Sequence, residues 1–401
     1  MSNRWAVLAI LCLARTSMGL HLQVVAAVAP FLIADLGLTY TEVGLLIGLF
    51  MLPGAFLAMP GSLVSRRIGD RATLLGGLSL LTLGTGLLAV SPGFALAAVA
   101  RLVSGAGGTL LTMQVAKVAT DWFAGRELAT ALGILMGTFP LGIALAMATL
   151  GGLAAAATWQ VAVAAIAASG ALILTLVALF YRDLPRQEAS DLERPRLWAI
   201  GSRELRLVLV AGSAFAILNA GFVVFPSFTA PLLIERGRSE AQAGLLASWA
   251  SLASIVSIPL AGYLLDRAGR TTLWLVLSAL LTAIACLALP LQEPAWPWIV
   301  LFGIATGPVA VGLMALPGAV LRPDSRNTGF GLFFTMNYIG FALLPSVAGS
   351  LLDITQSTAA PIWFGGALYL SIVPLVLLFR HLKRRPIPSG EELTDVPSYK
   401  S

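Results

Sequence analysis

The stretch from Trp5 to Ile33 constrains the fold most, because it is apolar for long enough to cross a bilayer and yet carries Arg15 and His21. At about 1.5 Å of rise per residue, Arg15 stands about 15 Å from Trp5, near the middle of a hydrocarbon layer about 30 Å thick. A charge at that depth is costly and usually faces a bundle interior or a wet cavity. The stretch therefore predicts a membrane helix with one functional face. The alternative is that Arg15 only pairs with carbonyl groups of neighbouring helices.

Helical spacing gathers the polar and small residues of this stretch on one side. Arg15, Gly19 and Gln23 follow each other at intervals of four, and Ser17 and His21 form a second such pair. We predict that Arg15, Gly19, His21 and Gln23 contact a substrate, and that protons co-transported with it are carried on the substrate or on His21.

Composition extends this reading to the whole chain. Apolar residues make up 58% of the sequence and charged residues 11%, and the mean hydropathy is +0.90. The first run is too long for a signal peptide and leads into further runs, so we expect it to be retained. Cys12 and Cys286 lie inside expected spans, which supports neither a disulfide framework nor a metal site. Twelve runs predict an all-α membrane protein, at residues 5–33, 42–64, 72–90, 94–118, 128–150, 158–181, 205–234, 241–265, 271–290, 296–321, 327–352 and 360–380.

The basic residues predict the orientation in the membrane. With a cytoplasmic N-terminus, all but four of the 25 Lys and Arg fall on the cytoplasmic side. Arg236 and Arg238 fall outside, and Arg15 and Arg101 lie within the membrane. The pI of about 9.7 is thus a topology signal rather than a sign of nucleic-acid binding. We expect both termini in the cytoplasm and a bacterial inner membrane as the location.

The chain divides into two halves of one design. The longest charged interruption runs from Arg182 to Glu204 and separates six spans from six. We predict an N-terminal bundle at 1–181, a cytoplasmic linker at 182–204, a C-terminal bundle at 205–385 and a tail at 386–401. Similar loops follow the second and the eighth span, offset by about 200 residues, as internal repeats of transporters do. These loops read GSLVSRRIGDR from Gly61 and GYLLDRAGR from Gly262.

The first loop resembles the cytoplasmic loop motif of the major facilitator superfamily through Gly61, Ser65, Arg66, Gly69 and Arg71. The resemblance covers essentially the whole chain. It is reinforced by the sequence RLVSGAG from Arg101, by WF and Glu127 ahead of the fifth span, and by the Gly/Pro-rich fifth span, in which Thr138 and Phe139 separate Gly137 from Pro140. The resemblance implies two six-helix bundles, alternating access, and a central cavity lined by spans one, four, seven and ten.

The loop motif also implies gating residues. Ser65 stands where family members carry Asp, whereas the second half keeps Asp266, followed by Arg267. A carboxylate near a helix N-terminus stabilises it by about 0.3 to 1 kcal/mol. We therefore expect Asp266 to cap the start of span five near Arg126, and Ser65 to offer span eleven only a hydroxyl group.

The membrane interior contains guanidinium groups and lacks carboxylates. All 19 Asp and Glu fall at helix ends, in loops or in the tail. Two interior arginines, Arg15 and Arg101, are then best balanced by an anionic substrate, for which Arg offers a two-pronged fork. Further expected contacts to the substrate come from mid-membrane residues of spans four, seven and eleven, namely Thr112, Asn219, Phe222, Asn337 and Tyr338.

Other function classes fit the sequence less well. An enzyme would need a nucleophile, a metal cluster or an acid pair, and the chain has just two histidines. We expect no cofactor, no metal and no nucleic acid, and a functional monomer in the bilayer that moves a small, anionic solute. The sequence is most similar to the cyanate, nitrate/nitrite and organic-anion carriers of the superfamily. A multidrug-type exporter and a non-transporting sensor of transporter ancestry stay open as alternatives.

Overall fold

The computed structural model describes residues 4–57, 68–124, 127–182, 200–269, 271–322 and 325–384, apart from the side chains of Ala129, Asp266, Ala268 and Asn327. Within these residues the regular structure is entirely helical. Twelve helical segments are long and apolar enough to cross a membrane. The predicted number and order of spans are therefore confirmed.

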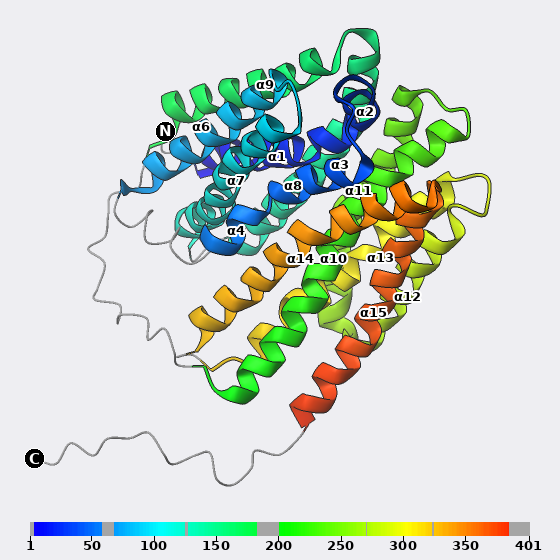
Figure 1. Ribbon diagram of the computed structural model, residues 1–401. Coiled ribbons are helices and arrows are strands. Elements are labelled where there is room, and N and C mark those ends of the chain that lie inside the picture. Colours follow the sequence, from blue (N-terminus) through cyan, green and yellow to red (C-terminus); the bar gives the residue numbers. More distant parts are fainter. Residues whose placement is uncertain are drawn as a thin grey trace, which may run out of the picture.

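The helices of the first half pack together on one side of the molecule (Figure 1). The first predicted span is two helices, because Val28 interrupts it just before Pro30. The second span is interrupted at Phe50 and Met51. The helices are α1 (Arg4–Ala27), α2 (Ala29–Leu36), α3 (Tyr40–Leu49), α4 (Leu52–Leu57), α6 (Asp70–Ala89), α7 (Phe94–Phe123), α8 (Leu128–Ala156) and α9 (Trp159–Phe180).

The helices of the second half form the other side of the molecule (Figure 1). They are α10 (Ser202–Glu235), α11 (Glu240–Ala268), α12 (Thr271–Ala288), α13 (Trp296–Ala315), the short 3₁₀ helix η1 (Pro317–Ala319), α14 (Arg326–Thr355) and α15 (Ala359–Arg384). We call the end of the molecule at which Arg4 and Arg384 lie the linker end. The opposite end, with the short connections at residues 37–39, 157–158, 236–239 and 356–358, is the hairpin end.

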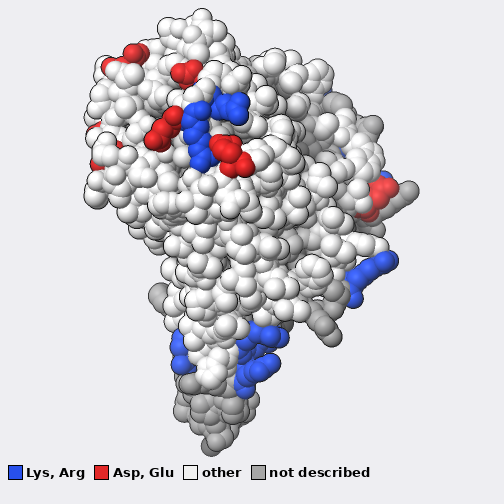
Figure 2. All heavy atoms as spheres, turned by 90° about the vertical axis from the view of Figure 1, so that its right-hand side faces the viewer, with Lys and Arg blue, Asp and Glu red and all other residues white. Residues whose placement is uncertain are grey.

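The outer surface has the charge distribution of a membrane protein. Large apolar side chains are exposed along most spans, for example Leu83, Leu172, Val256 and Ile304. Figure 2 shows that the middle of one face is mostly uncharged; Lys, Arg, Asp and Glu gather above it, and the described charged residues at its lower end are Lys and Arg. Every described carboxylate stands near a helix end or in a connection, as the sequence predicted.

Small residues let the helices approach closely, as is usual inside membranes. An added Cβ on Gly107 would overlap the backbone of α6, and one on Gly105 would overlap the carbonyl of Phe50. The bundle centres are thus densely packed. Because the helices lie so close together, buried polar side chains come within hydrogen-bond distance of the backbone of neighbouring helices.

Candidate functional site

Arg101 lies at the centre of the first bundle and is fully buried. Its Nε donates to the carbonyl of Leu46 (2.9 Å), Nη1 to that of His21 (2.7 Å) and Nη2 to that of Leu22 (2.9 Å). The guanidinium also lies 4.5 Å from the centre of the Phe50 ring, a favourable cation–π distance. Arg101 therefore ties α7 to α1 and α3 through backbone atoms.

This arrangement differs from the predicted convergence of two arginines on one cavity. Arg101 meets α1 at His21 and Leu22, about 10 Å along the helix from Arg15. Substrate contact by Arg101 stays a prediction, but in this conformation its three nitrogens are occupied by carbonyl groups. The alternative that the sequence left open for Arg15, pairing with neighbouring carbonyls, is what the structure shows for Arg101.

Arg15 is in a different environment, at mid-height of α1 and only partly buried. Its Nη2 donates to Sδ of Met136 at 3.6 Å, and its guanidinium lies 5.9 Å from the centre of the Phe139 ring. Its Nε is buried without a hydrogen-bond partner among the described residues. A thioether is a weak acceptor, so Arg15 retains most of its capacity to bind an anion.

Phe139 is a contact of Arg15 that the sequence analysis did not assign to the site. It is one of the two residues that separate Gly137 from Pro140 in the fifth span, where the chain departs from the family pattern. This departure from the family pattern marks the place at which α8 passes close to α1, and it is the sequence feature that could have indicated Phe139. An added Cβ on Gly19 would overlap the carbonyl of Phe139 and lie 3.0 Å from Cα of Gly142.

Tyr338 of α14 is the predicted site residue of the second bundle that lies near Arg15. Its ring packs against Gly54, where an added Cβ would lie 2.6 Å from Cγ of the ring. The side chain is buried and within electrostatic range of Arg15. Arg15 and Tyr338 are therefore predicted site residues that the structure brings together, across the boundary between the bundles.

His21 and Gly19 do not lie toward the second bundle. Nδ1 of the fully buried His21 donates to the carbonyl of Ser17 at 2.7 Å. Nε2 lies toward Gly170 of α9 and Thr82 of α6. The ring therefore packs inside the first bundle, and Gly19 serves the close crossing of α1 with α8. Direct substrate contact by either residue finds no support in this geometry.

Gln23 joins the two bundles. Its Nε2 donates to Oγ of Ser227 on α10 at 3.0 Å and to Sδ of Met147 on α8 at 3.4 Å. Its Oε1 is buried without a partner among the described residues. Because Gln23 lies one turn from the hairpin end of α1, this bond belongs to the closed side of the boundary between the bundles.

The remaining predicted contacts divide between the two bundles. Nδ2 of Asn219 donates to Oδ1 of Asn337 at 2.9 Å, which links α10 to α14. Phe222 stacks on Phe302, with ring centres 6.4 Å apart. Thr112 donates to the carbonyl of Gly108 at 2.9 Å and lies 3.0 Å from Sδ of Met18.

The bundles are closed against each other at the hairpin end. The carboxylate of Asp353, at the end of α14, accepts bonds from the backbone nitrogens of Tyr40 (3.0 Å) and Thr41 (2.7 Å) and from the Thr41 hydroxyl (2.5 Å). A C-terminal-bundle carboxylate thus caps α3 of the other bundle. Further along α3, added Cβ atoms on Gly44 and Gly48 would overlap the α14 backbone.

A second contact line joins α8 and α11. An added Cβ on Gly244 would overlap the carbonyl of Met147, and one on Gly151 would lie 3.1 Å from the carbonyl of Glu240. Toward the linker end the line stops after Gly137, which faces Ile255. Gly133 and Gly262 have no atom near an added Cβ among the described residues. Among the described residues, the contact between α8 and α11 therefore ends toward the linker end.

The loop motif lies at this linker end and is described in part. Gly61, Ser65, Arg66 and Arg126 are outside the described residues, as is the side chain of Asp266, so the predicted caps stay predictions. Gly69 has φ 92°, a value that favours glycine.

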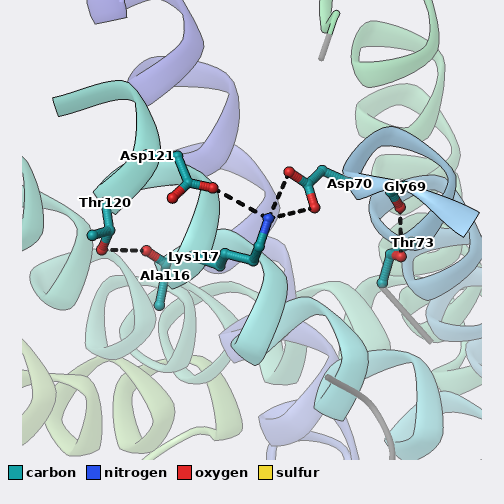
Figure 3. A network of polar contacts seen from close by, with 7 residues as sticks. All are labelled: Gly69, Asp70, Thr73, Ala116, Lys117, Thr120 and Asp121. Atoms are coloured by element: carbon teal, nitrogen blue, oxygen red, sulfur yellow. Dashed lines mark hydrogen bonds and ion pairs between the residues drawn. The ribbon is translucent and has the colours of Figure 1, made fainter. Parts of the chain in front are cut away.

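The described part of the motif consists of ion pairs and backbone contacts. Lys117 lies between Asp70 (2.7 Å) and Asp121 (3.2 Å), which joins α6 to α7 (Figure 3). Nη2 of Arg71 donates to the carbonyl of Ala178 at 2.6 Å. In the second half, Arg267 lies over the ring of Tyr263 at 4.4 Å.

The comparisons with known proteins agree on one family. The model of the Major Facilitator Superfamily matches residues 10–236 and 209–399. The hexuronate transporter of Bacillus subtilis is 25% identical over 407 residues, which is 92% of this chain and 93% of the relative. The putative tartrate transporter of Agrobacterium vitis is 23% identical, with 86% of this chain and 83% of the relative covered. The lysosomal dipeptide transporter MFSD1 of Danio rerio is 26% identical over 70% of this chain, and the match spans 65% of that relative's length.

Solved structures show the same fold. A bacterial homologue of the human lysosomal transporter Spinster, in an inward-facing and occupied conformation, superposes with a TM-score of 0.71 at 19% identity, covering 95% of this chain and 96% of the other. A variant of the nucleoside transporter NupG gives a TM-score of 0.76 at 12% identity, covering 95% of this chain and all of the other.

Proposed function

The chain belongs to the Major Facilitator Superfamily, and we propose that it is a secondary active transporter that moves a small anionic solute by alternating access rather than an enzyme. Two relatives that match most of the chain are named as a hexuronate transporter and a putative tartrate transporter, and both of these solutes are carboxylates. That likeness favours an organic acid as the substrate. The dipeptide carried by the MFSD1 relatives also has a carboxylate group.

The proposal that the substrate is an anion rests on the environment of Arg15. The guanidinium lies at mid-height beside Met136 and Phe139, and no described carboxylate pairs with it. A guanidinium in a water-poor site gains most from a ligand that supplies two acceptor oxygens. We assign the substrate carboxylate to Arg15 and give Arg101 the task of holding α1 in place behind it.

The contact pattern supports alternating access. Asp353, Gln23 and the glycines of α3 hold the bundles together at the hairpin end, whereas Gly133 and Gly262 have free space at the linker end. A solute could then reach Arg15 from the linker end. The excess of Lys and Arg at that end supports a cytoplasmic location for both termini in a bacterial inner membrane, and hence an inward-facing state of a functional monomer.

Substrate binding by purified variants tests this assignment. Each charge-assisted hydrogen bond contributes about 1.5 to 3 kcal/mol, so Arg15→Gln should weaken binding of the recognised acid by roughly one to two decades. Arg15→Lys should recover part of the loss, because it keeps the charge but not the fork. The panel is a hexuronate, tartrate and a dipeptide, measured by binding and by counterflow in proteoliposomes.

Arg206→Gln is the matched control, since Arg206 is an exposed arginine at the linker end that bonds only to the carbonyl of Ser202 among the described residues. It should bind as the wild type does. Full affinity in a folded Arg15→Gln protein, or a cationic substrate, would refute the anion assignment and favour a multidrug-type exporter. Absence of counterflow by every member of the panel, with binding intact, would point to a sensor.

A further inference from the structure

A cavity of about 320 Å³ opens on the hairpin end, at the boundary between the bundles and away from Arg15. Tyr40 supplies its wall from the first bundle. The rest of the lining comes from α10, α14 and the connection before α15, namely Pro231, Ile234, Glu235, Leu352, Gln356 and Thr358. Its size is at the lower end of the range of small-molecule sites.

The charge of this cavity is negative. One oxygen of the Glu235 carboxylate accepts the hydroxyl proton of Thr358, and the other has no partner among the described residues. The carboxylates of Glu235 and Asp353 both lie within electrostatic range of the Tyr40 hydroxyl. Asp353 is occupied by three donors of Tyr40 and Thr41, so the second oxygen of Glu235 is the carboxylate acceptor that a ligand can use.

The uncharged lining has two parts with different chemistry. The half-buried Ile234 and the edges of the buried Pro231 and Leu352 form a small apolar part of the lining, and Tyr40 adds an aromatic ring, a group that attracts cations. A carboxylate, an aromatic ring and an apolar surface together suit an organic ammonium ion that carries a short hydrocarbon or aromatic body. They do not suit the anion assigned to Arg15.

We propose that this cavity is a binding site for small organic cations, distinct from the substrate site, and that its occupation holds the hairpin end closed. The cavity needs both bundles, because Tyr40 is part of the α3 terminus that Asp353 caps while Glu235 and Thr358 belong to the other bundle. A ligand that bridges them binds the closed state better than the open one. By linkage, it opposes opening to the same extent.

Benzylammonium is the probe, and benzyl alcohol is its neutral counterpart of similar shape. Binding is measured on the full chain in detergent by titration calorimetry, with empty micelles as the blank for partitioning. Benzylammonium should bind and benzyl alcohol should bind at least fivefold more weakly. Glu235→Gln should lose roughly tenfold or more in benzylammonium affinity, since it keeps the shape and removes the charge. Glu240→Gln removes a carboxylate from the same end outside the cavity and should bind as the wild type does.

Three further variants test the aromatic ring of Tyr40 and the dependence of binding on the closed state. Tyr40→Phe keeps the ring and should bind, whereas Tyr40→Leu should not. Gly48→Leu inserts a side chain against Ala342 without changing any charge, and should weaken benzylammonium binding by separating Tyr40 from Glu235. Equal binding of the two probes, unchanged binding by Glu235→Gln, or an equal loss in Glu240→Gln would overturn the proposal. None of these results bears on the anion at Arg15.

Discussion

At the centre of the first bundle, α1 and α7 meet around Arg101, whereas the corresponding helices of the second bundle, α10 and α13, meet around Phe302. Arg101 donates to three carbonyls. Phe302 is equally buried, but it stacks on Phe225 with ring centres 3.7 Å apart and meets the edge of Tyr369 at 5.6 Å. The two halves have the same order of helices, but different interactions hold their centres together.

The difference has a mechanical consequence. Hydrogen bonds from a planar guanidinium fix the relative heights of the helices, because a displacement of 1 Å breaks their geometry. Stacked rings lose little energy on a small slide or rotation, since dispersion is not directional. The first bundle is thus the stiffer support, and it is the bundle that carries Arg15.

The two boundaries between the bundles differ in a similar way. The hairpin end of α14 carries Asp353, whose carboxylate caps α3. The matching end of α8 carries Leu153 beside Gly151 and Gly152, and it meets α11 through small-residue packing. The start of α11 is capped within its own bundle by Ser239, whose side chain accepts from the backbone of Gln242. Both boundaries are thus packed through glycines, and the one between α3 and α14 has a charged cap in addition.

The largest expected effect comes from Arg101. Arg101→Lys keeps the charge, but one ammonium group cannot reach three carbonyls on two helices. Loss of two charge-assisted bonds should lower the free energy of unfolding by about 3 kcal/mol or more. Phe302→Leu should cost about 1 to 2 kcal/mol, through lost stacking and contact. Thermal unfolding of both purified variants in one detergent measures the difference.

Arg101→Met, of similar length without donors, is the companion variant for this test. It separates the lost hydrogen bonds from the cost of a buried charge, because replacing a buried charge by an apolar group can be nearly neutral. If Arg101→Lys unfolded at the same temperature as the wild type, the three hydrogen bonds would contribute nothing to the stability of the bundle. The contrast with Phe302 would then fail.

The next effect concerns the charged boundary. Asp353→Ala removes the inter-bundle cap and should destabilise the closed hairpin end by about 1 to 2 kcal/mol, a five- to thirtyfold population shift. Leu153→Ala at the matching end of α8 should change this balance by less than about 0.5 kcal/mol. Distances between spin labels on the two bundles at the hairpin end report the populations. Identical distance distributions in the two variants would show that the boundaries are held alike.

The depth of Arg15 in the membrane and the absence of interior carboxylates could be predicted from the sequence, because both follow from hydropathy alone. It did not reach the partners of Arg101, since Leu22, Leu46 and His21 contribute only backbone carbonyls, which leave no side-chain signal. The role of Asp353 was hidden for the same reason. Its acceptor oxygens meet backbone nitrogens some 310 residues away in the chain, and periodicity says nothing about such contacts.

The smallest expected effect concerns two ion pairs at the linker end. Arg4 at the start of α1 meets Glu127 after α7 at 2.5 Å. At the corresponding place in the second bundle the charges are exchanged, and Glu204 at the start of α10 meets Arg322 after α13 at 3.2 Å. Glu204 also accepts from the backbone of Arg322 and Gly201 and from the hydroxyl of Ser325. Its side chain is 11% exposed, against 37% for Glu127.

Exposed ion pairs contribute about 0.2 to 1 kcal/mol and are screened by salt, whereas hydrogen bonds to a charged group that is shielded from water contribute more. Glu127→Gln should therefore lower the unfolding free energy by less than about 0.5 kcal/mol, and only at low salt. Glu204→Gln should cost about 1 kcal/mol or more at any salt concentration, because its backbone donors stay in place and meet a weaker acceptor. Melting curves at two salt concentrations separate the variants. Equal, salt-sensitive losses would mean that the exchanged pairs are equivalent and that burial at the start of α10 adds nothing.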